Sequence, residues 1–366
     1  MTYVALGDVT RNLDAKRVPV RSSSRQPGPY PYYGASGIVD WVSDFLFEGR
    51  HLLVAEDGEN LRSRNTPVAF LADGKFWVNN HAHVLTAVPG ISDIRYLCYQ
   101  LQLADMTGYL TGSAQPKLNR SALDSIQIWL PDLATQTAIA DVLGALDDKI
   151  AANEQMVTAL DSLVRAMVEG GMQGESVRVG DVASLVSLKS NGGGPVVTYL
   201  GLEHLPRRRL WAQDSGLSSE VTSQKSVFEE GDLLFGKLRP YFHKVVVAQH
   251  SGVCSTDILV VRAIEKELRG WMWAALASDD VVAAVTASST GTRMPRASWG
   301  DLAEVQVPWP GRSEAARVSR EIESLNARAA AAVAESRRLA ATRDALLPEL
   351  MSGRLKVKGI AEGARE

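Results

Sequence analysis

Clusters of cationic, amide and aromatic side chains in polar stretches have the clearest chemical potential in this sequence. The densest cluster, residues 237–244, interleaves four basic or imidazole side chains with two aromatic rings, and an arginine triplet occupies positions 207–209. Such side chains donate hydrogen bonds to phosphate oxygens and to the acceptor edges of bases. They therefore indicate nucleic-acid contacts, although an ordinary solvated surface explains the arginine triplet equally well. The candidate contact residues are Tyr32, Tyr33, Ser36, Asn79, Asn80, His81, His83, Thr111, Gln115, Lys117, Arg207, Arg208, Arg209, Lys237, Arg239, Tyr241, Lys244, Thr290, Arg293 and Arg296.

Motifs for catalysis are missing from the sequence. It contains neither Gly-x-Gly-x-x-Gly nor Gly-x4-Gly-Lys-Ser/Thr, and residues 28–32 match an Asn/Asp-Pro-Pro-Tyr motif only with the wrong spacing. A nuclease-like pattern could be drawn from Asp57 and residues 73–75. Residues 147–149 fit the same short pattern inside an expected helix, so the pattern carries little information. We expect no catalytic residue in this chain.

The sequence evidence for a metal site is equally weak. His81 and His83 could form a pair on one strand face, but no cysteine lies nearby and Asp73 is the closest acidic residue before them. The two cysteines, Cys98 and Cys254, suit small buried positions in a reducing compartment. The sequence therefore predicts no metal site.

An internal repeat must position these side chains. Residues 111–117 are echoed at 290–296, and the same offset of 179 aligns residues 125–131 with 304–310. Residues 6–9 recur at 179–182. The chain is therefore built as two halves of one plan, each a globular block followed by a helix.

Both blocks contain short apolar runs separated by polar turns, which is typical of strands. We expect strands at residues 52–55, 68–71, 196–200, 232–235, 244–248 and 257–261.

Two long helical patterns follow the blocks. One spans about residues 135–167 and the other about 313–351, with Pro348 expected to kink or end the second. A helix of roughly 33 residues is about 50 Å long and needs a packing partner. The expected partner is the other helix in an antiparallel coiled coil; the alternative is that each helix packs on its own domain. The expected coiled-coil residues are Ile139, Leu143, Leu146, Ile150, Leu160, Val318, Ile322, Leu325 and Leu339.

These patterns predict an α+β fold with two globular mixed α/β domains, two long helices and a pseudo-two-fold repeat. The expected segments are domains at 1–133 and 172–312, helices at 134–171 and 313–352, and a tail at 353–366. The chain of 366 residues has a net charge of -3, which argues against a nonspecific nucleic-acid coat. It has no long apolar run and no signal-peptide pattern, so we expect a cytoplasmic protein without a membrane segment.

Several contiguous motifs in both halves of the chain resemble those of the specificity subunit of type I restriction-modification systems. In the first half the resemblance rests on residues 32–38, 53–58 and 77–85. In the second half it rests on residues 199–204, 231–241 and 254–258. The stretch from 115 through 131 into the helix resembles the region that closes each half in that family. Residues 293–296, Arg-Met-Pro-Arg, depart from Ala-Gln-Pro-Lys at 114–117.

The resemblance implies a subunit that reads double-stranded DNA and is not itself an enzyme. Each recognition domain would read one half of a split, asymmetric target, and the helices would set the spacing between the half-sites. It also implies docking of DNA methyltransferase subunits, conventionally two, and of restriction/translocase subunits. S-adenosylmethionine, ATP and Mg would belong to those partners, leaving no cofactor in this chain.

Other classes of function remain open at this stage. One is the recognition subunit of a related type II modification system, which only the neighbouring genes would distinguish. Another is a non-enzymatic coiled-coil scaffold that joins two protein-binding domains.

Overall fold

The computed structural model describes residues 3–112, 115–169, 175–190, 196–220, 223–289 and 294–357. The chain divides into two compact units. The first unit comprises Met1–Lys149 and Leu339–Glu366, and the second comprises Ile150–Arg338.

The first unit contains two four-stranded sheets and a separate strand pair. One sheet has the order β2-β9-β6-β7 and is antiparallel throughout; the other has the order β4-β3-β8-β5, with β3 parallel to β8. The strands are β1 (Tyr3–Ala5), β2 (Thr10–Asn12), β3 (Tyr30–Gly34), β4 (Gly37–Val42), β5 (Phe47–Glu48), β6 (His51–Ala55), β7 (Ala69–Ala72), β8 (Lys75–Val78), β9 (Ala82–Ala87) and β10 (Gln127–Trp129). The short helices are α1 (Leu6–Val9), α2 (Asn60–Ser63), α3 (Ile94–Leu103) and α4 (Arg120–Ser125).

The second unit repeats this plan. Its sheets have the orders β12-β20-β17-β18 and β13-β16-β19-β14-β15, and β14 is parallel to β19. The strands are β11 (Glu175–Arg178), β12 (Ala183–Leu185), β13 (Lys189–Ser190), β14 (Thr198–Leu200), β15 (Gly216–Leu217), β16 (Lys225–Phe228), β17 (Leu233–Gly236), β18 (Val245–Val247), β19 (Gly252–Cys254), β20 (Ile258–Ala263) and β21 (Gln306–Trp309). The helices are α6 (Val179–Val182), α7 (Arg269–Leu276), α8 (Asp279–Ser288) and α9 (Trp299–Ala303).

The internal repeat is thus confirmed in the topology. Strand β1 pairs with β10 in the first unit just as β11 pairs with β21 in the second, so each block is closed by its own first and last strands. All six apolar runs that we expected to be strands overlap β6, β7, β14, β17, β18 or β20.

The central strands are apolar without alternation because both of their faces are covered. In β6, Leu52 and Val54 belong to the core beneath the helices, whereas Leu53 belongs to the core around β8 and its neighbours. Strand β17 follows the same rule: Leu233 and Phe235 lie in the core with α7, and Leu234 lies in the other core. A strand buried on both faces loses the polar half of its pattern.

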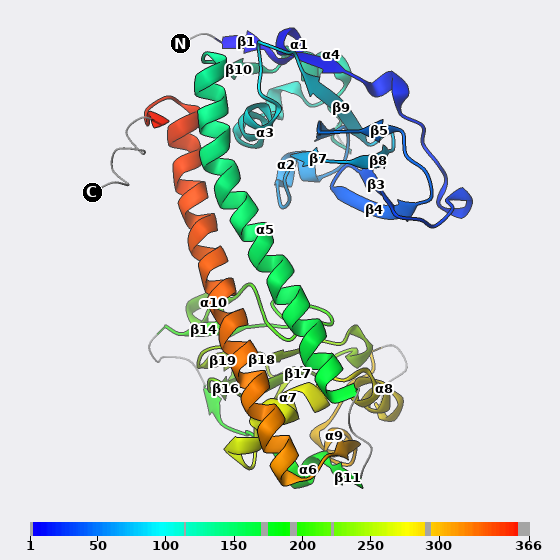
Figure 1. The fold of residues 1–366 in the computed structure, drawn as a ribbon, viewed down its shortest axis with the longest axis vertical. Coiled ribbons are helices and arrows are strands. Elements are labelled where there is room, and N and C mark those ends of the chain that lie inside the picture. Colours follow the sequence, from blue (N-terminus) through cyan, green and yellow to red (C-terminus); the bar gives the residue numbers. More distant parts are fainter. Residues whose placement is uncertain are drawn as a thin grey trace. The chain divides into compact units, whose positions relative to one another are not determined.

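The two long helices are α5 (Leu133–Glu169) and α10 (Arg312–Met351), drawn in green and in orange to red in Figure 1. In the first unit, Asp147 of α5 accepts a hydrogen bond from Arg343 of α10 at 2.7 Å. In the second unit, the Asn153 amide donates to Glu335 at 2.8 Å. Residue numbers rise along α5 as they fall along α10, so the helices pair antiparallel, as expected. Pro348 lies in the last turn, and α10 ends three residues later.

The expected coiled-coil residues lie at helix contacts that also belong to the domain cores. Ile139, Leu143, Leu160, Val318 and Ile322 are buried. The other four, Leu146, Ile150, Leu325 and Leu339, are half-buried. Both sequence interpretations are therefore partly right, since the two larger hydrophobic clusters each join residues of both helices to residues of a domain.

No helix within the described ranges is both long and apolar enough to cross a membrane.

Candidate nucleic-acid interface

Each unit brings two distant segments together at an equivalent corner. In the first unit, the Gly58 amide donates to the Pro116 carbonyl at 3.1 Å, and the Leu118 amide donates to the Glu56 carbonyl at 2.8 Å. In the second unit the same two bonds appear as Arg239 to Pro295 at 2.8 Å and Ala297 to Lys237 at 2.9 Å. Positions 56–58 are therefore equivalent to 237–239, and 117 is equivalent to 296.

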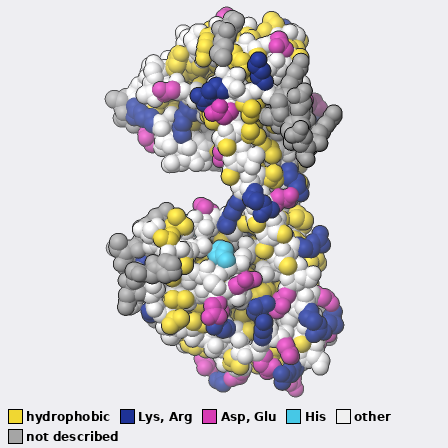
Figure 2. All heavy atoms as spheres, turned by 90° about the vertical axis from the view of Figure 1, so that its left-hand side faces the viewer, with side chains coloured by type: hydrophobic (Ala, Val, Ile, Leu, Met, Phe, Trp, Pro, Cys, Tyr) yellow, Lys and Arg dark blue, Asp and Glu magenta, His cyan; other side chains and the backbone are white. Residues whose placement is uncertain are grey.

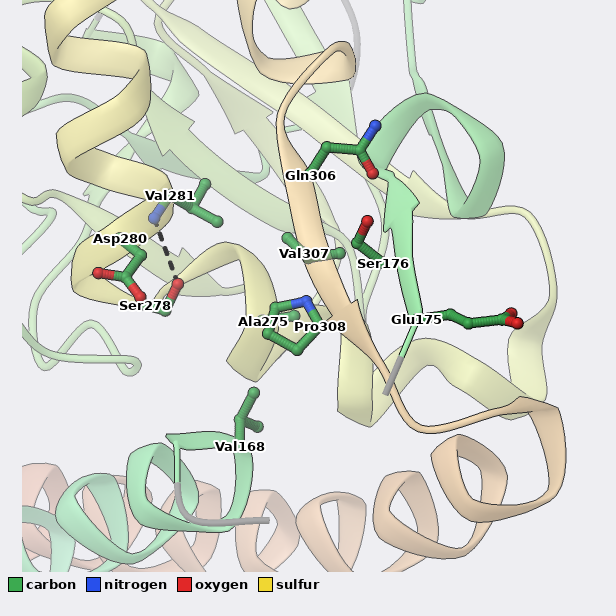
Figure 3. A pocket seen from close by; sticks show the side chains of 10 residues that line it. All are labelled: Val168, Glu175, Ser176, Ala275, Ser278, Asp280, Val281, Gln306, Val307 and Pro308. Atoms are coloured by element: carbon green, nitrogen blue, oxygen red, sulfur yellow. Dashed lines mark hydrogen bonds between the residues drawn. The ribbon is translucent and has the colours of Figure 1, made fainter. Parts of the chain in front are cut away.

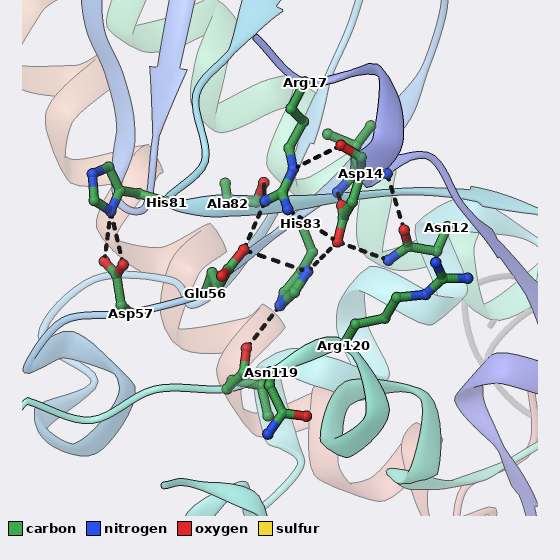
Figure 4. Close-up of polar contacts among 12 residues, drawn as sticks. Asn12, Asp14, Arg17, Glu56, Asp57, His81, Ala82, His83, Asn119 and Arg120 are labelled. Atoms are coloured by element: carbon green, nitrogen blue, oxygen red, sulfur yellow. Dashed lines mark hydrogen bonds and ion pairs between the residues drawn. The ribbon is translucent and has the colours of Figure 1, made fainter. Parts of the chain in front are cut away.

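In the first unit, this corner is built around an ion-pair network (Figure 4). Arg17 contacts Glu56 at 2.8 Å and Asp14 at 3.3 Å, and Lys117 contacts Glu56 at 3.3 Å. His83 places one ring nitrogen 2.6 Å from Asp14 and the other 2.8 Å from the Leu118 carbonyl. The network ties η1 (Asp14–Lys16) to strands β6 and β9.

The pKa of Asp14 reflects this network. Burial alone would raise it, but hydrogen bonds from His83 and from the Val84 amide outweigh burial and hold the pKa below its usual value.

Asp14, Glu56 and His83 offer three ligand atoms within 4.8 Å of one another. The same carboxylates are already paired with Arg17 and Lys117, whose positive charges oppose a bound cation. The donor set therefore fits an ion-pair cluster better than a metal centre.

The exposed members of this corner are polar donors. The His81 ring lies 2.8 Å from an Asp57 carboxylate oxygen while about half of its side chain remains exposed (50%). The Asn79 side chain accepts from the His81 amide at 2.8 Å. Asn80, Lys117, Thr111, Gln115 and Ser36 are also exposed. His81 and Lys117 therefore present donors that neighbouring carboxylates help to hold.

Two of the residues expected to contact nucleic acid are placed where they cannot do so. Tyr32 is 1% exposed, with its hydroxyl accepting from the Val20 amide and the Arg25 guanidinium 4.2 Å from its ring centroid. His83 is also 1% exposed, because Asp14 and Leu118 hold its ring inside the corner. The prediction of direct contact is wrong for both residues, and their role is to support the exposed loops.

Two further candidates in the first unit are largely enclosed. Tyr33 is half-buried against Phe70 and Phe76, and Asn79 is 8% exposed. Asn79 serves the His81 backbone rather than an open surface.

The corresponding corner of the second unit is dominated by cations. Arg296 pairs with Asp257 at 2.8 Å, and Lys237 donates to the Thr256 carbonyl at 2.7 Å. Burial, followed by the nearby charge of Lys189, lowers the pKa of Lys237, and the Arg296 charge acts in the same direction. Lys244 donates to the Leu202 carbonyl, and burial together with the Arg207 charge lowers its pKa. Several positive charges therefore lie close together around Lys237 and Lys244.

The arginine triplet lies beside the turn η5 (Pro240–Phe242). Arg207 lies 3.9 Å from the centroid of the Phe242 ring, Arg208 pairs with Asp279 at 3.0 Å, and Arg209 donates to Thr158 of α5. Tyr241, at the tip of the turn, is 51% exposed. Segments 207–209 and 237–244 thus lie together. Thr290 and Arg293 fall outside the described residues.

The partners that hold these side chains escaped the sequence interpretation. Asp57, Asp257 and Asp279 each pair with an expected contact residue, and Asp14 and Glu56 anchor the first corner. Glu56 and Asp57 lie in the motif at 53–58, and Asp257 lies in the motif at 254–258. Asp14 and Asp279 lie outside every motif, so no local signal marked them.

The charges on the surface and in one pocket were also compared with what nucleic-acid binding requires. Figure 2 shows basic and acidic side chains interspersed over the displayed face of each unit. A pocket of about 450 Å³ in the second unit lies beside β21 and α8 and is lined partly by Glu175, Asp280 and Gln306 (Figure 3). Its described lining includes two carboxylates and no cationic side chain, so its charge opposes a polyanion.

Comparisons with known proteins found similar sequences among the specificity subunits of type I restriction enzymes. Residues 1–161 match the family model described as the type I restriction modification DNA specificity domain. A Haemophilus influenzae protein, provisionally named a type I restriction enzyme specificity subunit, is 38% identical over 141 residues, which cover 38% of this chain and 36% of that protein. The Escherichia coli EcoDI specificity subunit is 24% identical over 378 residues, which cover 88% of this chain and 80% of that protein.

One solved structure shares the fold. The crystal structure of a type I restriction-modification S subunit from M. genitalium superimposes with a TM-score of 0.63 at 16% identity, covering 96% of each chain. At that identity the match shows the common architecture.

Proposed function

We propose that this chain, a relative of the specificity subunits of type I restriction-modification systems, is the DNA-reading subunit of such a system. Each unit would read one part of a split, asymmetric target. The chain would perform no catalysis itself, in keeping with the absence of cofactor motifs from its sequence.

The equivalence of the two corners carries this proposal. The same backbone hydrogen bonds present Glu56 and Lys117 in the first unit but Lys237 and Arg296 in the second. The frame is constant, but the side chain changes from a carboxylate at Glu56 to an ammonium at Lys237, while Lys117 and Arg296 are both cationic. A different side chain at a matched position suits the recognition of two different half-sites. Hydrogen-bonding side chains at such positions distinguish bases through their groove edges.

The paired helices and the closing strands would dock the partner subunits. These would be methyltransferase subunits, two by analogy with the family, and restriction/translocase subunits in the complete enzyme. S-adenosylmethionine, ATP and Mg would be held by those partners, and the complex would act in the cytoplasm on double-stranded DNA. The methyltransferase would flip its target adenine out of the duplex.

The test is to produce this chain with the methyltransferase of its own genome in a methylation-free host and to map modified bases by long-read sequencing. We expect methyladenine in a split, asymmetric motif that disappears when either protein is omitted. Absence of methylation, with a methyltransferase that is active alongside another specificity subunit, would contradict the proposal and favour the scaffold alternative.

A domain exchange adds a second test. Replacing residues 1–110 with the corresponding block of another specificity subunit should change one half of the motif and preserve the other. A change in both halves would contradict the assignment of one reader to each unit.

A further inference from the structure

Two arginines of the second unit lie over one aromatic ring without a counter-charge. The guanidinium groups of Arg207 and Arg239 lie 3.9 Å and 5.8 Å from the centroid of the Phe242 ring. Within the described ranges, neither forms an ion pair, and the Arg239 Nε atom is buried without a hydrogen-bond partner. The neighbouring Arg208 and Arg296, by contrast, each have an aspartate within 3.0 Å.

The backbone of Arg239 adds an independent observation. Its φ of 51° lies in the left-handed region, which is unfavourable for a residue with a Cβ. The equivalent position of the first unit is Gly58, with φ of 109°, and the two residues donate the same backbone hydrogen bond. The loop can therefore be built with glycine. An arginine in its place costs conformational free energy, which a contact made by its side chain can offset.

The surroundings make an anion the natural ligand. Lys237 and Lys244 lie in the same segment, and nearby cations contribute to lowering the pKa of each. Two uncompensated guanidinium groups on one ring repel each other unless an anion joins them. Arginine is well suited to this task because its planar group can stack on the ring while its N–H groups donate to oxygen.

We propose that Arg207 and Arg239, stacked on Phe242, form a clamp for a backbone phosphate of the DNA in the second half-site. This inference rests on the proposed function and specifies the kind of contact made there. The clamp fixes the position of the second unit on the duplex and is indifferent to base identity. A free phosphate ion would satisfy the same donors, so the experiment must separate the two sources.

The experiment uses the full chain in complex with its methyltransferase. Fluorescence anisotropy measures the Kd for a duplex with the mapped target and for one with a scrambled second half-site, over a range of salt concentrations. Because each phosphate contact contributes a slope of about 0.9, Arg239→Gly should weaken binding about eightfold at about 0.1 M salt and reduce the salt slope by about one. Discrimination between the two duplexes should be unchanged.

The variant Arg239→Gly suits this purpose because glycine accommodates the left-handed backbone, so its thermal unfolding should match that of the wild type. The matched control is Arg64→Gly in the first unit, which removes another left-handed arginine (φ 49°) whose guanidinium donates to the Gln102 carbonyl at 2.8 Å. Its salt slope should equal that of the wild type. If Arg239→Gly misfolds, Arg207→Ala changes an exposed side chain and makes the same prediction.

Three outcomes overturn the clamp. One is wild-type affinity of both clamp variants at every salt concentration. Another is lost discrimination with an unchanged salt slope, which would indicate a base contact. The third is that the wild type binds inorganic phosphate in calorimetry and Arg239→Gly does not, while the variant binds DNA as tightly as the wild type. A wild-type complex that does not discriminate between the duplexes contradicts the proposed function itself, whatever the variants do.

Discussion

Removing the Asp161 carboxylate should destabilise the second unit and release the loop that carries the arginine triplet. Asp161 lies on α5 and is 5% exposed. One carboxylate oxygen accepts from the Leu210 amide at 2.8 Å, and the other contacts Arg165 at 3.0 Å. Arg165 in turn donates to the Ala277 carbonyl at 2.7 Å. Asp161 therefore joins the helix to the segment just after residues 207–209.

The expected loss of unfolding free energy follows from the burial of the Asp161–Arg165 ion pair. Only 8% of the Asp161 side chain and 17% of the Arg165 side chain are exposed, so solvent screens the pair weakly. Breaking a buried ion pair from one side costs about 3–5 kcal/mol, because the remaining charge stays buried. The Arg165 Nη2 atom already lacks a hydrogen-bond partner among the described residues. We expect Asp161→Ala to lower the free energy of unfolding by about 3–4 kcal/mol, a figure that includes the unsatisfied Leu210 amide.

Two measurements check this value. Calorimetry of the full chain should show the transition of the second unit about 10 °C lower, at roughly 2–4 °C per kcal/mol. Hydrogen exchange should accelerate at the Leu210 amide and leave the β6 amides of the first unit unchanged. The control Asp161→Asn keeps an acceptor for Leu210, so it should retain more of that amide's protection while still losing the ion pair. A cost below about 1 kcal/mol for Asp161→Ala would refute the reasoning, since that is the value of a solvent-exposed pair.

Three further predictions concern acid stability, packing and spacing. Because the pKa of Asp14 is held below its usual 3.8, its stabilising contribution is complete above that pH and is lost as pH falls through the lowered value. Asp14→Asn should therefore reduce the difference between urea midpoints measured at about pH 5 and about pH 3; an unchanged difference would count against the His83 pairing. Gly252→Ala would place a Cβ atom 2.4 Å from the Thr198 carbonyl oxygen. It should lower the free energy of unfolding, measured by thermal unfolding, by about 1–3 kcal/mol. Gly108→Ala, which has no neighbour within 4 Å, should be nearly neutral, and equal costs would contradict the close contact. Inserting one heptad in α5 after Pro131 should change the gap between methylated half-sites or abolish assembly, whereas an unchanged gap in an active complex would show that the helices do not set it.

The α+β architecture could be predicted because its signals are local. The repeat is visible as matched residues at a constant offset, and α5 and α10 follow from apolar residues at helical spacing. Short apolar runs predicted β6, β17 and β20 because central strands buried on both faces are apolar throughout. The resemblance to specificity subunits also came from contiguous motifs.

The site could be predicted only as a set of side-chain types. Composition identified segments 207–209 and 237–244, and the structure brings them together around Phe242. Composition could not show that Tyr32 and His83 point inward, because a polar aromatic or imidazole ring suits a surface and a satisfied core equally well.

The sequence by itself therefore determined the two long helices, six of the strands and the two-part plan, since these depend on neighbours along the chain. Tertiary structure alone decided which charges are neutralised. The His83 ring contacts Asp14, 69 positions away, and Arg208 donates to Asp279, 71 positions away. The Arg239 Nε atom is buried without a hydrogen-bond partner among the described residues. Such pairings arise when strands and loops distant in sequence are folded against one another, and no local pattern encodes them. The unpaired guanidinium on a left-handed backbone, which underlies the proposed phosphate clamp, exists only in the folded chain.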